Sequence, residues 1–232
     1  MKTLVITGAS KGIGLATARK FCDDGYRVIN FSRSIPPDPR IESHEIDLSR
    51  QDVEEELSAL LAMTIDGGEI CLVHNAARLV NDSAKDTEPE ALLDIFRLNL
   101  VAPQMLNKSL IGKMQPGSSI LYIGSTLSEK AVANSFSYVT SKHGIVGMMR
   151  ATCQDLAESG IHTSCICPGF TNTEMLRAHV GESQDILDSI AAMSSFSRLI
   201  EPDEIADTIY FASQNPVLNG AVIHANLGQI ES

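Results

Sequence analysis

Positive charge is scarce in this sequence. Its 18 lysine and arginine residues are outnumbered by 29 aspartates and glutamates, which gives a formal net charge of −11 and a pI of about 4.9. Binding to nucleic acid or to an anionic membrane surface relies on clustered cations, so this composition argues against both partners. Small molecules are the expected partners.

Cysteine is also sparse, with five residues in the chain. Cys22, Cys71 and Cys153 are far apart and the total is odd, so we expect no disulfide framework and a reducing, cytoplasmic location. Cys165 and Cys167 form a C-x-C, but no second ligand cluster stands at zinc-finger spacing. We interpret this pair as alternating side chains of a strand and expect no metal site.

Long apolar runs are missing as well, since none approaches the roughly 20 residues that a membrane-spanning helix needs. Strand-like residues begin almost at Met1, and we expect no signal peptide before them. Hydrophobic residues make up 44% of the 232 residues, which is enough for a sizeable core.

Strand-like and helix-like segments alternate along the chain. We expect strands at 4–6, 27–31, 41–46, 70–73, 119–123, 162–166 and 221–225, and helices at 13–22, from Ser49, at 89–106, at 138–158 and from Pro202. We expect Ser49 to cap the second of these helices. This alternation predicts an α/β fold, namely a doubly wound parallel sheet of the Rossmann type with helices on both faces. No domain boundary is visible, so we expect one domain over 1–232 with a lid at about 174–200.

A glycine-rich turn follows the first expected strand and opens the first expected helix. It contains Gly8, Ser10, Lys11, Gly12, Ile13 and Gly14. Glycine lets a phosphate approach the backbone closely, and the helix start offers unpaired N–H groups and a positive dipole end. We predict that the turn holds the pyrophosphate of a dinucleotide. The G-x-x-x-G-x-G spacing differs from the G-x-G-x-x-G fingerprint, and a plain strand–helix turn is the alternative.

The end of the second expected strand bears on which dinucleotide is bound. An acid there would accept hydrogen bonds from a ribose 2′-hydroxyl, whereas a cation accommodates a 2′-phosphate. Ser32 stands where the acid would be, Arg33 follows it, and Lys11 can approach the same phosphate. Two cations and no acid favour NADP(H) over NAD(H). The alternative is that both are solvated surface charges.

Tyr138 and Lys142 are four residues apart in a long expected helix, which places both on one face. A neighbouring ammonium stabilises a phenolate, so Tyr138 can donate a proton to a carbonyl oxygen as hydride arrives. Ser125 lies thirteen residues earlier, and its hydroxyl can hydrogen-bond the same oxygen. Because a Y-x-x-x-K pair alone is usually incidental, this prediction depends on the glycine turn.

The glycine turn together with Ser125, Tyr138 and Lys142 resembles the short-chain dehydrogenase/reductase family, over essentially the whole chain. The resemblance implies that these three are the catalytic residues and that Asn99 supports a proton-relay water beside the lysine. It also implies cofactor contacts from Asp47, Leu48, Asn75, Ala76, Ala77, Tyr138, Lys142, Pro168, Gly169, Thr171 and Thr173. The sequence departs from the family pattern at Ala77, where glycine is usual, and at Leu227, where the family more often has glycine.

The resemblance implies an NADP(H)-dependent oxidoreductase that transfers a hydride between nicotinamide and a carbonyl or secondary alcohol, closest in look to the 3-oxoacyl-carrier-protein reductase branch. The alternatives are an NAD-dependent alcohol dehydrogenase of the same fold and a dinucleotide-sensing protein without turnover. Family members usually form homodimers or homotetramers through the helices that here begin near Pro89 and Tyr138. Apolar residues of the lid, among them Met175, Ile186 and Leu187, either face substrate or belong to ordinary helix core.

Overall fold

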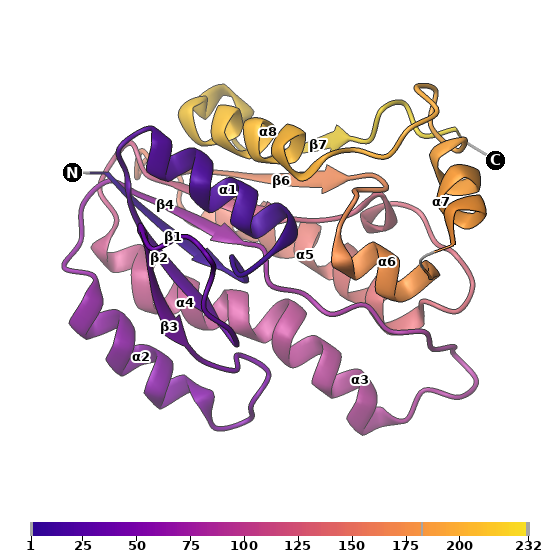
Figure 1. Ribbon diagram of the computed structural model, residues 1–232. Coiled ribbons are helices and arrows are strands. Elements are labelled where there is room, and N and C mark those ends of the chain that lie inside the picture. Colours follow the sequence, from indigo (N-terminus) through magenta and orange to yellow (C-terminus); the bar gives the residue numbers. More distant parts are fainter. Residues whose placement is uncertain (1, 182, 231–232) are drawn as a thin grey trace.

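A parallel β-sheet of seven strands forms the centre of the structure, a computed structural model that describes residues 2–181 and 183–230 (Figure 1). The strands are β1 (Thr3–Thr7), β2 (Arg27–Ser32), β3 (Ile41–Glu45), β4 (Ile70–His74), β5 (Ser119–Ile123), β6 (His162–Pro168) and β7 (Ala221–Ala225). Their order is β3-β2-β1-β4-β5-β6-β7, and all neighbours pair in parallel. The chain winds outward in one direction from β1 and in the other from β4, so the predicted doubly wound sheet is confirmed.

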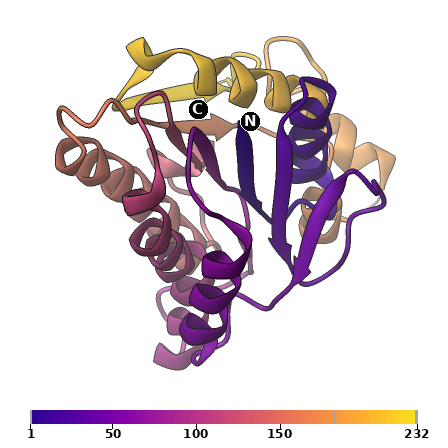
Figure 2. The same cartoon turned by 90° about the vertical axis from the view of Figure 1, so that its left-hand side faces the viewer.

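Helices cover both faces of this sheet (Figure 2). One face carries α1 (Gly12–Asp23) and α8 (Pro202–Gln214), and the other carries α2 (Val53–Thr64), α4 (Ala102–Leu110) and α5 (Phe136–Asp155). The remaining α-helices are α3 (Pro89–Phe96), α6 (Glu174–Val180) and α7 (Gln184–Ala191). Within the described ranges, every helix is too short or too polar to span a membrane.

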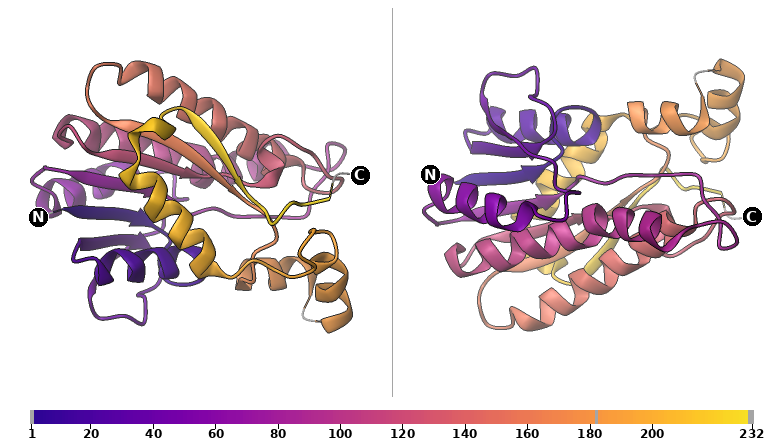
Figure 3. Two further views of the ribbon diagram at one scale, coloured as in Figure 1. Left: turned by 90° about the horizontal axis from the view of Figure 1, so that it is seen from above. Right: turned by 90° about the horizontal axis from the view of Figure 1, so that it is seen from below.

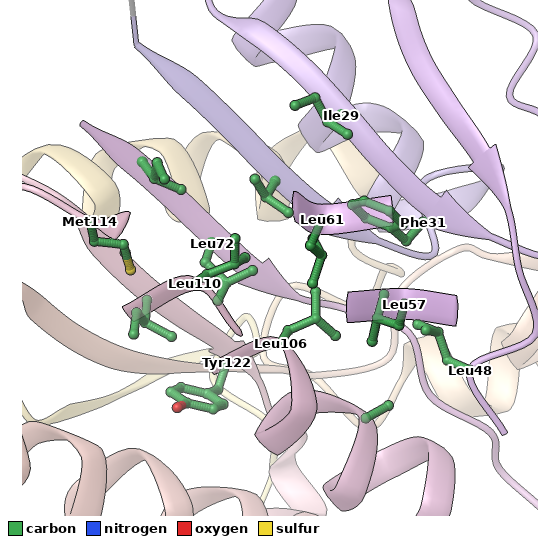
Figure 4. Packing of buried hydrophobic residues seen from close by; sticks show 14 of the residues in the cluster. Ile29, Phe31, Leu48, Leu57, Leu61, Leu72, Leu106, Leu110, Met114 and Tyr122 are labelled. Carbon is green, nitrogen blue, oxygen red and sulfur yellow. The ribbon is translucent and has the colours of Figure 1, made fainter. Parts of the chain in front are cut away.

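Alternating side chains of the strands divide the core between the two faces. On β1, Leu4 and Ile6 belong to the cluster under α1 and α8, while Val5 belongs to the larger cluster under α2, α4 and α5. Figure 4 shows the larger cluster, in which Leu57 from α2 and Leu106 from α4 cover the sheet. Full burial of one leucine contributes about 1.5–3 kcal/mol, so these layers fix the positions of the strand ends that build the site.

The helix expected from Ser49 begins later, at Val53, and Ser49 does not cap it. The backbone N–H and the hydroxyl of Ser49 both donate to Asp47 Oδ1, at 2.9 and 2.6 Å. Ser49 is therefore part of a turn with Asp47 ahead of α2, and Asp52 occupies the N-cap position instead. That part of the prediction was wrong.

The single helix expected over 89–106 is interrupted by a π-helical turn, Arg97–Val101, after which α4 continues to Leu110. A π-helical turn holds one extra residue, which hydrophobic periodicity does not reveal. The other differences are shifts of element ends by one to three residues, as where the helix expected over 138–158 occupies Phe136–Asp155.

A chain of buried polar side chains links β4, α4, β5 and α5. His74 Nε2 lies 2.9 Å from Asn107 Oδ1, and Asn107 Nδ2 donates to the Tyr122 hydroxyl at 2.8 Å. Tyr122 in turn lies 3.1 Å from the hydroxyl of Thr152, which donates to the backbone of its own helix. Asn107 Oδ1 accepts from Nε2, so the Nδ1 atom of His74 carries no proton. Nδ1 has no partner among the described residues.

We expect His74 to make the protein less stable as the pH falls from about 6.5 to 4. Burial lowers the pKa of His74 to about 4 in the folded state, against about 6.5 in an unfolded chain. The unfolded state therefore binds the extra proton first, and the free energy of unfolding declines across this window by roughly 3 kcal/mol. Urea unfolding at a series of pH values measures the effect.

A His74→Gln variant keeps a donor toward Asn107 and removes the titration, so its free energy of unfolding should depend less steeply on pH. His143→Gln is the matched control, because His143 is exposed on α5. A His74→Gln protein whose pH dependence equals that of the wild type would contradict the assignment.

Candidate active site and dinucleotide cleft

A cleft of about 520 Å³ opens at the carboxyl end of the sheet, where β1 and β4 lead the chain in opposite directions. This is the position at which doubly wound sheets bind ligands. Fourteen of the predicted cofactor residues line it: Gly8, Ser10, Lys11, Gly12, Ile13, Gly14, Ser32, Arg33, Asp47, Leu48, Asn75, Ala76, Ala77 and Thr173. Five predicted contacts, Tyr138, Lys142, Pro168, Gly169 and Thr171, are not part of its lining.

The glycine turn is shaped so that side chains are excluded from it. Gly8 and Gly12 have φ of +71° and +54°, which side chains rarely adopt. A methyl group on Gly14 would lie 2.3 Å from Gly8 O and 2.5 Å from Asn75 Nδ2. Asn75 Nδ2 donates to the carbonyl oxygens of Thr7 and Gly8, each at 3.0 Å, and so ties the end of β4 to the turn.

The start of α1 is open to an anion. Lys11 occupies the N-cap position and makes no side-chain capping hydrogen bond. The first N–H groups of a helix lack partners within the helix, and the helix dipole adds positive potential there. The glycine turn, from which side chains are excluded, and the uncapped start of α1 together fit a bound pyrophosphate.

Beside the cleft, the end of β2 presents cations and no free carboxylate. Ser32 is buried, and its hydroxyl accepts from Asn30 Nδ2 at 2.7 Å and donates to Ser34 O at 2.8 Å. Arg33 and Lys11 are exposed at the rim. Hydrogen bonds from Ser49, helped by nearby positive charge, hold the pKa of Asp47 below its usual value.

Ser125, Tyr138 and Lys142 come from two neighbouring elements. Tyr138 and Lys142 lie buried on α5, with the Lys142 ammonium 5.4 Å from the centre of the Tyr138 ring. Lys142 Nζ donates to Ile123 O at 2.7 Å, which ties the ammonium to the end of β5. Ser125 follows β5 directly, and its Oγ accepts from Leu127 N at 3.1 Å. An accepting Oγ leaves the hydroxyl proton of Ser125 free to donate to another oxygen.

Two buried sulfur atoms lie beneath the residue before Ser125. Cys165 and Cys167 are strand residues of β6, as predicted, and both point to the same face of the sheet, with their Sγ atoms 3.9 Å apart. A methyl group on Gly124 would lie 2.7 Å from Cys167 Sγ, 2.8 Å from Cys165 Sγ and 2.8 Å from Ser128 Oγ. Only glycine fits at this position, so the loop that carries Ser125 lies directly on β6.

Asn99 sits in the middle of the π-helical turn and joins two loops of the site. Its Oδ1 accepts from Arg78 N at 2.9 Å, and its Nδ2 donates to Arg78 O at 3.1 Å and to Ser141 Oγ at 3.0 Å. Ser141 lies between Tyr138 and Lys142 and donates to Tyr138 O at 2.8 Å. Both donors of the Asn99 amide are thus engaged, and the relay water that the resemblance implies stays a prediction.

The segment expected to act as a lid forms α6 and α7, which stand apart from the main body at the carboxyl end of the sheet (Figure 3). Its apolar residues divide into two groups. Leu187 and Ile190 are buried, whereas Met175 and Ile186 are 40% and 43% exposed. Part of the segment is therefore helix core, and part presents apolar surface.

Two departures from the family pattern differ in their structural effect. Leu227 has a φ of +51°, a left-handed conformation that costs a residue with a side chain about 1–2 kcal/mol. Ala77 lines the cleft in the place of a glycine. It is followed by Arg78, a cation next to the cleft lining that the sequence motifs did not predict. The sequence did contain a signal for this residue, because Arg78 directly follows the Asn75-Ala76-Ala77 motif and is a third basic residue besides Lys11 and Arg33.

Comparisons with known proteins find a matching family profile, similar sequences and similar structures. A family profile described as Enoyl-(Acyl carrier protein) reductase matches residues 8–229. A candidate ketoacyl reductase of Streptomyces coelicolor is 30% identical over 229 residues, covering 89% of this chain and 88% of that protein. The crystal structure of a short chain dehydrogenase family protein from Francisella tularensis superposes with a TM-score of 0.90 at 25% identity, covering 98% of both chains.

Two further structures share the fold and hold a cofactor. The angucycline C-6 ketoreductase LanV, solved with NADP, has a TM-score of 0.82 at 22% identity and covers 98% of this chain and 95% of its own. The 4-hydroxyisoleucine dehydrogenase, solved with NADH, has a TM-score of 0.85 at 20% identity and covers 97% of this chain and 98% of its own. At these identities the likeness concerns the fold alone.

Proposed function

Because the chain belongs to the short-chain dehydrogenase/reductase family, we propose that it is an NADP(H)-dependent carbonyl reductase with Ser125, Tyr138 and Lys142 as its catalytic residues. The observation that carries the proposal is the arrangement of Lys142. Its ammonium is fixed by Ile123 O at 2.7 Å and lies 5.4 Å from the Tyr138 ring, immediately beside the loop of Ser125.

In this proposal the nicotinamide, when bound, supplies or accepts the hydride. Ser125 donates a hydrogen bond to the substrate oxygen and so stabilises the charge that develops on it. Tyr138 donates its hydroxyl proton to the same oxygen, and Lys142 stabilises the phenolate that remains. Asn99 holds α5 in register through Ser141, and the same groups act in the opposite sense when an alcohol is oxidised.

The direct test is the oxidation of NADPH by the purified protein with a panel of carbonyl compounds. The panel includes 3-oxoacyl thioesters, diketones, quinonoid pterins and simple aldehydes, each repeated with NADH. Turnover with NADPH supports the reductase, and turnover that prefers NADH would point to the NAD-linked dehydrogenase. Tight NADPH binding without turnover on any carbonyl would favour the sensor.

We expect Arg33→Ala to weaken NADPH binding by roughly 10- to 100-fold, the equivalent of one charge-assisted hydrogen bond of about 1.5–3 kcal/mol. NADH lacks the 2′-phosphate, so its dissociation constant should change by less than about threefold. Titration of cofactor fluorescence gives both constants. Arg150→Ala is the matched control, since Arg150 is exposed on α5 two turns beyond Lys142. Equal losses for both cofactors would contradict a 2′-phosphate contact at Arg33.

We further propose a homodimer or homotetramer that forms through α3, α4 and α5 and works in the cytoplasm. Leu93 on α3 and Val101 in the π-helical turn are each 48% exposed, which supports an apolar interface there. The five cysteines are all free, which fits a reducing compartment. Light scattering that returns the mass of a monomer, or fractionation that finds the protein outside the cytoplasm, would contradict these two proposals.

A further inference from the structure

Arg78 occupies a fixed position at the edge of the cleft. It follows Ala76 and Ala77, which line the cleft, in the loop after β4. Asn99 holds its backbone on both sides, accepting from Arg78 N at 2.9 Å and donating to Arg78 O at 3.1 Å. Because both backbone groups are bound, the start of the Arg78 side chain cannot move far from the cleft.

The guanidinium of Arg78 is incompletely satisfied by the protein. The residue is half-buried, and its Nε atom is buried without a hydrogen-bond partner among the described residues. Arginine does not lose its proton in proteins, so Nε is always a donor. A buried donor without a partner costs about 1–3 kcal/mol, and such groups in native proteins usually have a ligand or a functional reason.

The charge of Arg78 acts on the part of the cleft that Asp47 lines. After the hydrogen bonds from Ser49, the charges of Arg33 and Arg78 are what hold the pKa of Asp47 below its usual value. Arg33 and Arg78 therefore both lie within electrostatic reach of Asp47, which lines the cleft.

The charges that line the cleft are otherwise balanced. Lys11 and Arg33 supply two positive charges, and Asp47 and Glu174 supply two negative ones. The proposed ligand carries about two negative charges on its pyrophosphate and about 1.5 to 2 more on its 2′-phosphate. In a chain with a net charge of −11, such a ligand needs additional positive charge at the site.

We propose that the guanidinium of Arg78 binds a phosphate group of the dinucleotide, as a third cation beside Lys11 and Arg33. The inference rests on the proposed function, because it presupposes a dinucleotide in the cleft. The phosphate is either the 2′-phosphate, which NADP(H) alone carries, or the pyrophosphate that both dinucleotides share.

The test compares Arg78→Met, which keeps the length and apolar body of the side chain, with Arg78→Lys, which keeps the charge. Dissociation constants for NADPH and NADH are measured by cofactor fluorescence, without any turnover. We expect Arg78→Met to raise the dissociation constant of NADPH by about tenfold or more. Arg78→Lys should recover part of the lost affinity. Arg150→Met, at an exposed site on α5, should stay within about twofold of the wild type.

A loss confined to NADPH identifies the 2′-phosphate, and a loss shared by NADH identifies the pyrophosphate. Wild-type constants for both cofactors in Arg78→Met, with an unchanged melting temperature, would overturn the inference and leave the proposed function standing. Failure of the wild-type protein to bind either dinucleotide would overturn both. If Arg78→Met unfolds, Arg78→Gln decides, because it also removes the charge. Full NADPH affinity in a folded Gln variant, with Arg33→Ala still impaired, would overturn the inference.

Discussion

Replacing Tyr138 with phenylalanine is expected to lower kcat by roughly 10²- to 10⁴-fold, the range that a positioned general acid contributes. The substitution removes one oxygen and keeps the ring, which is buried on α5. Lys142 stays fixed by Ile123 O, and the residues that line the cleft are untouched, so the dissociation constant of NADPH should change far less than kcat. Steady-state kinetics on the best carbonyl, together with cofactor fluorescence, separate the two quantities.

Tyr26→Phe is the matched control for this experiment. The Tyr26 hydroxyl accepts from Gln214 Nε2 at 2.9 Å in the surface contact between the ends of α1 and α8, away from the cleft. Loss of the Tyr26 hydroxyl should leave kcat within about twofold of the wild type. A Tyr138→Phe enzyme that retained more than a tenth of wild-type kcat would show that another group delivers the proton.

Gly14→Ala should have the largest effect on stability, a loss of about 3 kcal/mol or more in the free energy of unfolding. The new methyl group would meet the backbone oxygen of Gly8 at 2.3 Å, and neither it nor Asn75 Nδ2 at 2.5 Å can withdraw without breaking the hydrogen bond between them. Alanine is favoured over glycine in a helix by only about 1 kcal/mol, which does not compensate. NADPH binding should be lost as well, because relief of the clash must open the turn.

Urea unfolding and NADPH titration measure both effects, with Gly112→Ala as the control. A methyl group on Gly112 meets no atom within 4 Å, and the residue is exposed. Its free energy of unfolding should stay within about 0.5 kcal/mol of the wild type. If the Gly14→Ala protein were as stable as the Gly112→Ala protein, the glycine turn would be able to accommodate the methyl group without loss of stability, and the prediction would be wrong.

The parts of the fold that follow from short-range periodicity could be predicted from the sequence. Buried strands such as β4 and β5 read as apolar runs, and Tyr138 and Lys142 share a face because of helical spacing alone. What failed depended on contacts between distant residues or on local competition. Ser49 was expected to cap a helix, but Asp47 takes both of its donors. The π-helical turn around Asn99 leaves no signal in the hydrophobic pattern.

The site was predictable where a motif carries its own geometry, and it was not predictable elsewhere. The glycines at positions 8 and 12 occupy the left-handed conformations that their motif implies. Arg78 was not predicted, because its place in the site depends on the hydrogen bonds of Asn99, twenty-one residues away, and on the nearby charge of Asp47. Neither relation exists until the fold has brought the loop after β4 beside the π-helical turn and within electrostatic reach of Asp47.

The order of strands in the sheet also determines the order in which they can pair while the chain is still being synthesised. Once His74 has been made, the four strands β3, β2, β1 and β4 can already lie side by side, and β5, β6 and β7 add outward on one side. Thr173, which lines the cleft, follows roughly 5–20 seconds later at typical synthesis rates of about 5–20 residues per second. During that interval the growing sheet presents an unpaired edge, first on β4 and then on β5 and β6. We therefore expect the nascent chain to be most prone to mispairing before its ligand can bind.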